Sequence, residues 1–290
     1  MKNTISRDIR ERPFLSGKPK ALGRGKRAIV TAVMVALILA LALRVVASGA
    51  INWSITFGFF FHPAILDGLV MTLELTALSM IVGVLLGIAL AVMAISRFPA
   101  VSAASALYVW IFRGTPLLVQ LIFWFNIALV FPVVGIGAWQ ISINSLVTPF
   151  AAALLGLGLN EAAYMAEIVR AGIKSVDSGQ GEAAVSVGLN RRQVMNSVIL
   201  PQALKVIIPP TANQTIGMLK NTSLVSVIGA QELLTKTEDI YARNFQVIEL
   251  LIVASLWYLV LTTVASAVQF WLERRFGDSR AVEVIAGVQP

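Results

Sequence analysis

A lysine and three small polar residues interrupt one apolar stretch of the chain; they are Lys220, Asn221, Thr222 and Ser223. If this stretch crosses a membrane, its ionisable side chain is costly there and is a functional candidate by default. Lys220 lies ten residues beyond Pro210, roughly 15 Å along a helix and near the middle of a bilayer core about 30 Å thick. Its ammonium group could bind a carboxylate while its polar neighbours orient the rest of a ligand. The alternative is a structural lysine paired with a carboxylate on another span.

A second apolar stretch carries acidic residues. Glu161 lies near its middle, with Tyr164 three residues later, and could pair with Lys220 or bind the amine of a ligand. Glu167 lies close to Arg170 toward the end of the same stretch, and we expect these two side chains to form a structural or gating ion pair. Glu161 and Glu167 are six residues apart, so they cannot share one face of a helix.

The composition predicts a polytopic membrane protein. The chain has 290 residues, of which 57% are apolar and 13% charged, whereas soluble domains are about one quarter charged. It contains no cysteine and one histidine, so a disulfide framework, thiolate chemistry and a His or Cys metal cluster are excluded. We therefore expect no metal and no cofactor on this chain. A membrane enzyme has no support either, because the single histidine, His62, falls in a predicted loop.

Six apolar stretches are long enough to cross the bilayer, for which about 20 residues are needed. The predicted spans are residues 28–47, 65–95, 115–134, 147–173, 207–229 and 247–272. Placing both termini inside puts most of the 23 Lys and Arg residues on the cytoplasmic side, as the positive-inside rule requires. The outer loops then hold Lys236 and Arg243. This arrangement accounts for the formal charge of +8 without nucleic acid as a partner.

The predicted fold is therefore an all-α polytopic membrane protein with six spans. Residues 1–27 form a basic cytoplasmic tail, residues 28–48 an N-terminal span and residues 277–290 a second cytoplasmic tail. We also expect a cytoplasmic interfacial helix in 97–114 and a short helix in the outer loop 231–246.

A polar segment, GEAAVSVGLNRRQVMNSVILPQ, separates the fourth and fifth spans on the cytoplasmic side. Asp177 with Gln180 three residues later predicts a helix start, and Gly188 predicts a stop. Asn190 and Gln193 repeat the start pattern. The result is a helix-turn-helix elbow whose small residues allow another surface to approach closely. An ordinary polar loop is the alternative.

The elbow resembles the EAA loop of ABC importer permeases, EAA-x3-G-x9-I-x-LP, with Val198 at the isoleucine position. The matching positions are Glu182, Ala183, Ala184, Gly188, Leu200 and Pro201. A second EAA triplet begins at Glu161, but Glu167 stands where the glycine should be and no Leu-Pro pair follows. The spacing therefore carries the resemblance, and the triplet alone does not.

Other stretches, among them YVWIFRGTPLLVQL and MLKNTSLVSVIGAQELL, extend the resemblance over about residues 65–276. They are similar to the polar amino acid uptake branch, the permeases for histidine, glutamine, glutamate, arginine and opines. The resemblance implies a permease domain over residues 60–276, with its coupling loop at 177–201 and a five-span core. Members often carry Asp after the lysine; Asn221 lacks that charge, which weakens the case for a cationic substrate.

The resemblance also implies partners and a mechanism. Two permease chains, identical or paralogous, would form the pathway in the inner, cytoplasmic membrane of a prokaryote. Two ATPase subunits, which hold ATP and Mg²⁺, would each receive one elbow, and a separate extracytoplasmic binding protein would deliver a polar amino acid. The implied contact and hinge positions are Glu182, Ala183, Ala184 and Gly188, while Arg191 and Arg192 could form charge pairs with the ATPase or serve only as topology anchors.

This chain has no G-x4-GK[ST] motif, so we do not expect it to hydrolyse ATP or to be an enzyme. The alternative function is a secondary transporter or channel that uses Lys220 and Glu161 as an ion relay. The EAA spacing argues against it, because a secondary carrier does not need a docking element for an ATPase.

Overall fold

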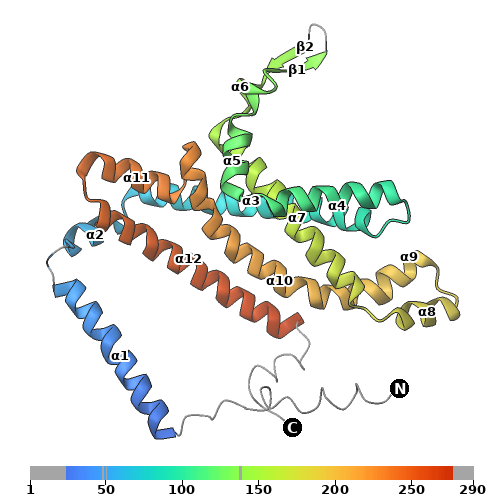
Figure 1. Cartoon of the computed structure of the whole chain (residues 1–290), viewed down its shortest axis with the longest axis horizontal. Helices are drawn as coiled ribbons and strands as arrows, with labels where there is room; N and C mark the ends of the chain where they lie inside the picture. The colour runs from blue at the N-terminus through green and yellow to red at the C-terminus, as the bar shows by residue number, and fades with distance from the viewer. Residues whose placement is uncertain (1–23, 48, 50, 137–138, 277–290) are drawn as a thin grey trace, which may run out of the picture. The chain divides into compact units, whose positions relative to one another are not determined.

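The computed structural model describes residues 24–47, 49, 51–136 and 139–276. These residues are mostly helical (Figure 1) and fall into two compact units, Met1–Asn52 and Trp53–Pro290. In the first unit, α1 (Arg24–Ala47) covers the first predicted span. The predicted C-terminal tail and residues 1–23 of the predicted N-terminal tail lie outside the described residues.

Three helices of the second unit are long and apolar enough to cross a membrane: α3 (Pro63–Ala94), α7 (Pro149–Lys174) and α12 (Val247–Phe276). They coincide with the second, fourth and sixth predicted spans. The histidine expected in a loop caps the start of α3, because the backbone N–H of Ala64 donates to His62 Nδ1 at 3.3 Å. The proline that follows suits the first helical turn, where its missing N–H has no partner to lose.

The third predicted span, 115–134, is not a continuous helix. This region forms α4 (Pro99–Gly114), α5 (Leu117–Phe125), the 3₁₀ turn η1 (Ile127–Leu129), strands β1 (Val133–Ile136) and β2 (Trp139–Ser142), and α6 (Ile143–Leu146). α4 and α5 meet at an angle of 102°, because Thr115 precedes Pro116 and a residue before proline disfavours the helical conformation. By length and composition, the described residues contain three candidate spans, or four if this bent pair is one.

The strands β1 and β2 form a small antiparallel hairpin that the predicted all-α class did not include. Val133 lies opposite Ser142, and Ile136 lies opposite Trp139. The hairpin projects away from the helices of its unit (Figure 1).

The fifth predicted span corresponds to α10 (Leu200–Asn221) and the 3₁₀ segment η3 (Thr222–Ile228). Pro209 and Pro210 lie inside a continuous α10, although a proline in a helix interior commonly kinks or breaks the helix. The helix changes its winding only at Thr222. Packing of α10 against α7 and α12 keeps the helix continuous past two residues that cannot donate a backbone hydrogen bond.

Close packing of α3 against α7 forms the centre of the second unit. Gly83 and Gly87 of α3 make this contact possible, since a Cβ on Gly83 would lie 2.6 Å from Glu161 Cγ and one on Gly87 would lie 2.5 Å from Met165 Cβ. Small residues at such positions let two helices approach closely in a membrane. The glycines of α3 therefore decide where the acidic residue of α7 can sit.

Short elements lie beyond the ends of these helices. In the predicted topology, α2 (Trp53–Phe60) and α11 (Leu233–Asn244) are extracytoplasmic, and α8 (Ser178–Ser186), α9 (Arg191–Gln193) and the π-helical turn η2 (Val194–Ile199) are cytoplasmic. The helices α4 and α11 confirm the two short helices predicted from the sequence.

Candidate functional site

A cavity of about 420 Å³ lies between α5, α7, α10 and η3. Its lining residues are Thr115, Pro116, Leu117, Asn160, Glu161, Tyr164, Gln214, Gly217, Asn221 and Leu224. Sites for small ligands have volumes of roughly 300–1,000 Å³ and a few convergent polar groups, and this cavity has both properties. The bend before α5 is what brings residues 115–117 to its wall.

Glu161 is the one charged residue among those that line the cavity. Its side chain is only 3% exposed, and Gln214 Nε2 donates to its Oε1 at 3.3 Å. A buried carboxylate is costly unless it is paired or fully hydrogen-bonded. Glu161 therefore retains a strong capacity to bind a cation or a hydrogen-bond donor that enters the cavity.

A hydrogen-bonded group fixes the bent chain beside the cavity. Gln120 Nε2 donates to Thr115 Oγ1 at 2.8 Å and to the carbonyl of Phe112 at 2.9 Å. Asn160 Nδ2 donates to Gln120 Oε1 at 3.2 Å and to the same carbonyl at 3.0 Å. These amides replace the backbone partners that the break between α4 and α5 removes. Sequence reasoning missed both residues, and the Thr-Pro step was the available signal.

The predicted substrate-pathway residues divide into two groups. Glu161, Tyr164 and Asn221 line the cavity, whereas Lys220 is exposed and does not line it. The structure records Gln214, and not Lys220, as the hydrogen-bond partner of Glu161. Successive helical residues point in different directions, so Lys220 and Asn221 cannot both face the cavity.

The last two predicted pathway residues support the winding of η3. Thr222 is fully buried, and its Oγ1 donates to the carbonyl of Leu219 at 2.7 Å. Ser223 Oγ donates to the carbonyl of Lys220 at 2.7 Å. Neither lines the cavity, and both satisfy carbonyls where α10 ends.

The predicted ion pair between Glu167 and Arg170 is present. Arg170 Nε donates to Glu167 Oε1 at 3.1 Å, and a second bond joins the other oxygen to Arg170 Nη2. The Arg113 guanidinium lies over the Tyr164 ring, 5.2 Å from its centroid. Arg113 and this ion pair line a further pocket of about 410 Å³. Tyr164, in the wall of the acidic cavity, therefore contacts an arginine that lines this further pocket.

The elbow forms with the predicted end signals. Asp177 Oδ1 accepts from the N–H of Gly179 at 2.8 Å and starts α8, and Gly188 has a φ of +89° where α8 has ended. Asn190 and Gln193 form a reciprocal capping box at the start of α9, as their spacing predicts.

Exposure within the elbow differs from one predicted contact residue to the next. Ala184 is 7% exposed and lies in the interior of the elbow, so it supports the turn. The exposed positions are Glu182, Ala183, Gly188, Arg191, Arg192, Leu200 and Pro201. Val185 and Val187, which sequence reasoning did not select, are 57% and 79% exposed. Apolar side chains this exposed next to charged ones are typical of protein contact surfaces.

A second buried carboxylate lies elsewhere in the unit. Glu232 is fully buried and accepts from Tyr258 Oη at 2.6 Å, from Thr72 Oγ1 at 3.4 Å, and from the N–H and Oγ1 of Thr235 at 2.9 and 3.3 Å. It thereby joins α3, α11 and α12. Sequence reasoning missed it, because Glu232 reads as an outer-loop residue and its partners lie far along the chain.

A family model, curated relatives and a solved structure that resemble this chain all belong to transport systems. A family model described as the binding-protein-dependent transport system inner membrane component matches residues 83–278. The arginine transport system permease protein ArgU of Corynebacterium glutamicum is 42% identical over 91% of this chain and 84% of its own length. The glutamate/aspartate import permease protein GltK of Escherichia coli O6:H1 is 34% identical over 73% of this chain and 93% of its own length. A crystal structure of an amino acid ABC transporter with histidines is 38% identical, with a TM-score of 0.66 over 74% of this chain and 95% of that chain.

Proposed function

The chain belongs to the binding-protein-dependent transport system inner membrane component family, and we propose that it carries a cationic amino acid across the cytoplasmic membrane of a prokaryote. It is a permease subunit of an ABC importer of amino acids. The observation that carries the choice of substrate is Glu161, the sole charge in the wall of the cavity.

Relatives alone leave the charge of the substrate open. One is named for arginine and another for glutamate and aspartate. A buried carboxylate attracts a guanidinium or ammonium group and repels an acidic side chain, and at low dielectric both effects are large. Asn221, which weakened the case for a cation in the sequence, is a neighbour of Glu161 in the cavity wall. Glu161 supplies the negative charge that Asn221 lacks.

The other end of an amino acid needs donors for its carboxylate. Side-chain amides of Asn221 and Gln214 and the hydroxyl of Tyr164 line the same cavity. These neutral donors can bind a carboxylate without cancelling the charge of Glu161. Lys220 is exposed, and we assign it no contact with the substrate in this conformation.

Movement of the substrate requires an external source of energy. We propose that two ATPase subunits, carrying ATP and Mg²⁺, each bind one elbow through its exposed face. The exposed pair Val185 and Val187 would enter an apolar part of the ATPase groove, and Glu182, Arg191 and Arg192 would surround it. A second permease chain, identical or paralogous, would complete the pathway, and a separate extracytoplasmic binding protein would deliver the amino acid.

Uptake by the reconstituted importer tests the choice of substrate. Radiolabelled arginine should enter proteoliposomes in an ATP-dependent manner, and lysine should compete for uptake better than glutamate does. Glu161→Gln should lower arginine uptake about 100-fold, since truncating a buried charge partner costs roughly 2–5 kcal/mol. Glu273→Gln, near the C-terminal end of α12 and outside the cavity wall, is the matched control and should transport normally. Unchanged arginine uptake and selectivity in Glu161→Gln would reject a cationic substrate.

A further inference from the structure

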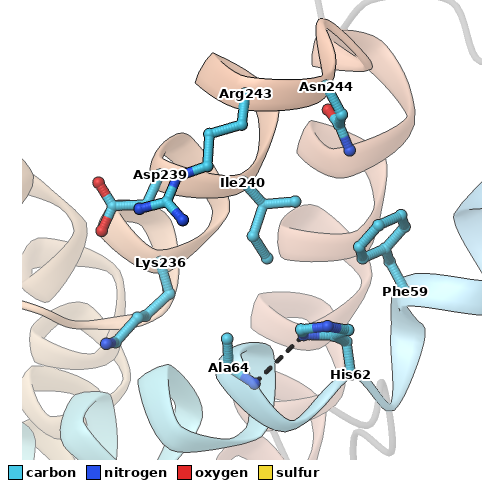
Figure 2. Close-up of a pocket in the computed structure, with 8 residues that line it drawn as sticks. All are labelled: Phe59, His62, Ala64, Lys236, Asp239, Ile240, Arg243 and Asn244. Carbon is cyan, nitrogen blue, oxygen red and sulfur yellow. Dashed lines mark hydrogen bonds between the residues drawn. The ribbon is translucent and has the colours of Figure 1, made fainter.

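A second pocket, of about 380 Å³, lies between α11 and the start of α3. In the predicted topology the outer loops hold Lys236 and Arg243, and both line this one pocket. Figure 2 shows Lys236, Asp239 and Arg243 grouped on one side of the pocket, with Phe59 and His62 on the other. The basic residues of the outer loops are therefore concentrated at a single place.

The charges of this pocket are unbalanced. Lys236, Asp239 and Arg243 follow one another at helical spacings of three and four, which places them on the same face of α11. Two cations thus accompany one carboxylate, and among the described residues neither Lys236 nor Arg243 has an ion pair. The first turn of α3 lies beside them, and a helix N-terminus also favours an anion. The pocket suits an acidic side chain.

An exposed aromatic residue lies next to the pocket. Phe245 follows Asn244, which lines the pocket, and its ring is 84% exposed. Its φ is +60°, and it is the one described non-glycine residue with a positive φ. Glycine or asparagine is the usual residue at this helix end, and a bulky residue there is strained. Strain of this kind is concentrated at functional sites.

We propose that Lys236, Arg243 and Phe245, the α11 docking surface, bind the extracytoplasmic binding protein. An acidic side chain of that partner enters the pocket between the two cations, and Phe245 packs against an apolar patch beside it. Arginine and large aromatic residues are the side chains enriched at binding hot spots. The family description itself names a binding protein, and this inference rests on the proposed function.

Binding of the purified binding protein to the complete importer in lipid nanodiscs tests the surface. Phe245→Gly should weaken the Kd by about ten-fold or more, as expected of a hot spot. Glycine suits the left-handed position, so the unfolding temperature of the same variant should be unchanged or higher. A merely structural role for Phe245 predicts no loss of affinity.

Substitutions of Lys236 and Arg243 test the charged part of the α11 docking surface. Lys236→Gln with Arg243→Gln should weaken the Kd several-fold and flatten its dependence on salt, because the partner charge is lost. Asp239→Asn should tighten binding. Arg275→Gln, which removes an exposed arginine at the far end of α12, should leave the Kd unchanged.

Three outcomes would overturn the inference. The first is wild-type affinity in both the Phe245 and the double variant. The second is unchanged affinity accompanied by loss of tightly bound phosphatidylglycerol in native mass spectrometry, which would make the pocket a lipid site. The third is a wild-type importer that binds no binding protein at all, which would reject the proposed function and this inference together.

Discussion

Glu161 and Glu232 are both carboxylates buried among the helices, yet their surroundings differ. Glu232 accepts four hydrogen bonds from three residues, which fills the capacity of a carboxylate. Glu161 accepts one, at 3.3 Å, and borders a cavity. Burial alone does not identify a ligand site. A buried carboxylate that can still accept hydrogen bonds does indicate one, because an incoming substrate can supply the missing donors.

The largest expected effect on stability is at Glu232, whose carboxylate already accepts four hydrogen bonds. Glu232→Ala leaves the hydroxyl of Tyr258 and the N–H of Thr235 buried without an acceptor. Each unsatisfied donor costs about 1–3 kcal/mol, so the free energy of unfolding should fall by about 3 kcal/mol or more. Thermal unfolding of the purified importer measures this. Glu232→Gln retains one acceptor oxygen and should lose less. An alanine variant as stable as wild type would show that the four bonds do not fasten α11.

The next effect concerns the space that Glu161 occupies. Gly83→Ala puts a methyl group 2.6 Å from Glu161 Cγ, and such overpacking costs about 1–3 kcal/mol. Arginine uptake should fall as well, because Glu161 must move. Gly217→Ala is the matched control, since it also lines the cavity but its Cβ meets nothing within 4 Å. That helical alanine should stabilise by roughly 0.5–1 kcal/mol; equal losses in both variants would contradict the packing argument.

A smaller effect on stability is expected at Glu161 itself. Glu161→Gln removes a charge that has a single hydrogen bond, so unfolding should change by no more than about 1 kcal/mol, in the stabilising direction. Uptake should collapse nevertheless. Guanidinium chloride unfolding, measured beside Glu232→Ala, separates the two residues. Equal losses of stability in both variants would contradict the distinction between Glu232, which accepts four hydrogen bonds, and Glu161, which accepts one.

The smallest effect on stability is expected at the elbow, which has no buried charge. Glu182→Lys and Val187→Asp alter exposed side chains, and such changes stay within about 0.5 kcal/mol. Co-purification of the ATPase subunits and ATP-dependent uptake should nonetheless be lost. Ser186→Ala, between them in α8, is the control. Normal co-purification in the two charged variants would show that the elbow does not bind the ATPase.

The elbow and the cavity also differ in how far the sequence predicts them. Caps at Asp177 and Asn190 and the stop at Gly188 are local signals, so spacing alone placed α8 and α9 correctly. The cavity joins α5, α7 and α10, and its geometry depends on a bend at Pro116 that hydropathy does not detect. The 102° bend falls between the predicted helix 97–114 and the predicted span 115–134. The sequence did not predict that α5 ends at Phe125 and that η1 and β1 follow it.

Side-chain direction was the other quantity that the sequence left undetermined. Lys220 was selected for its depth, but depth does not fix the direction in which a helical residue points, and it lies outside the cavity wall. Glu232 reads as part of a polar outer loop, and its burial depends on Thr72 and Tyr258, which are distant in sequence. Glu161, also selected from the sequence, does line the cavity, and its recorded partner is Gln214 and not Lys220.

The two prolines inside α10 have a mechanical consequence. Pro209 and Pro210 have no N–H, so the carbonyls of Lys205 and Val206 receive no helical hydrogen bond. Two missing bonds in succession make this the most compliant point of α10. It lies between the elbow, which ends where α10 begins, and Gln214 in the cavity wall. If an ATPase moves the elbow, as we propose, bending at these prolines would rotate the later part of α10 and with it the residues that line the cavity.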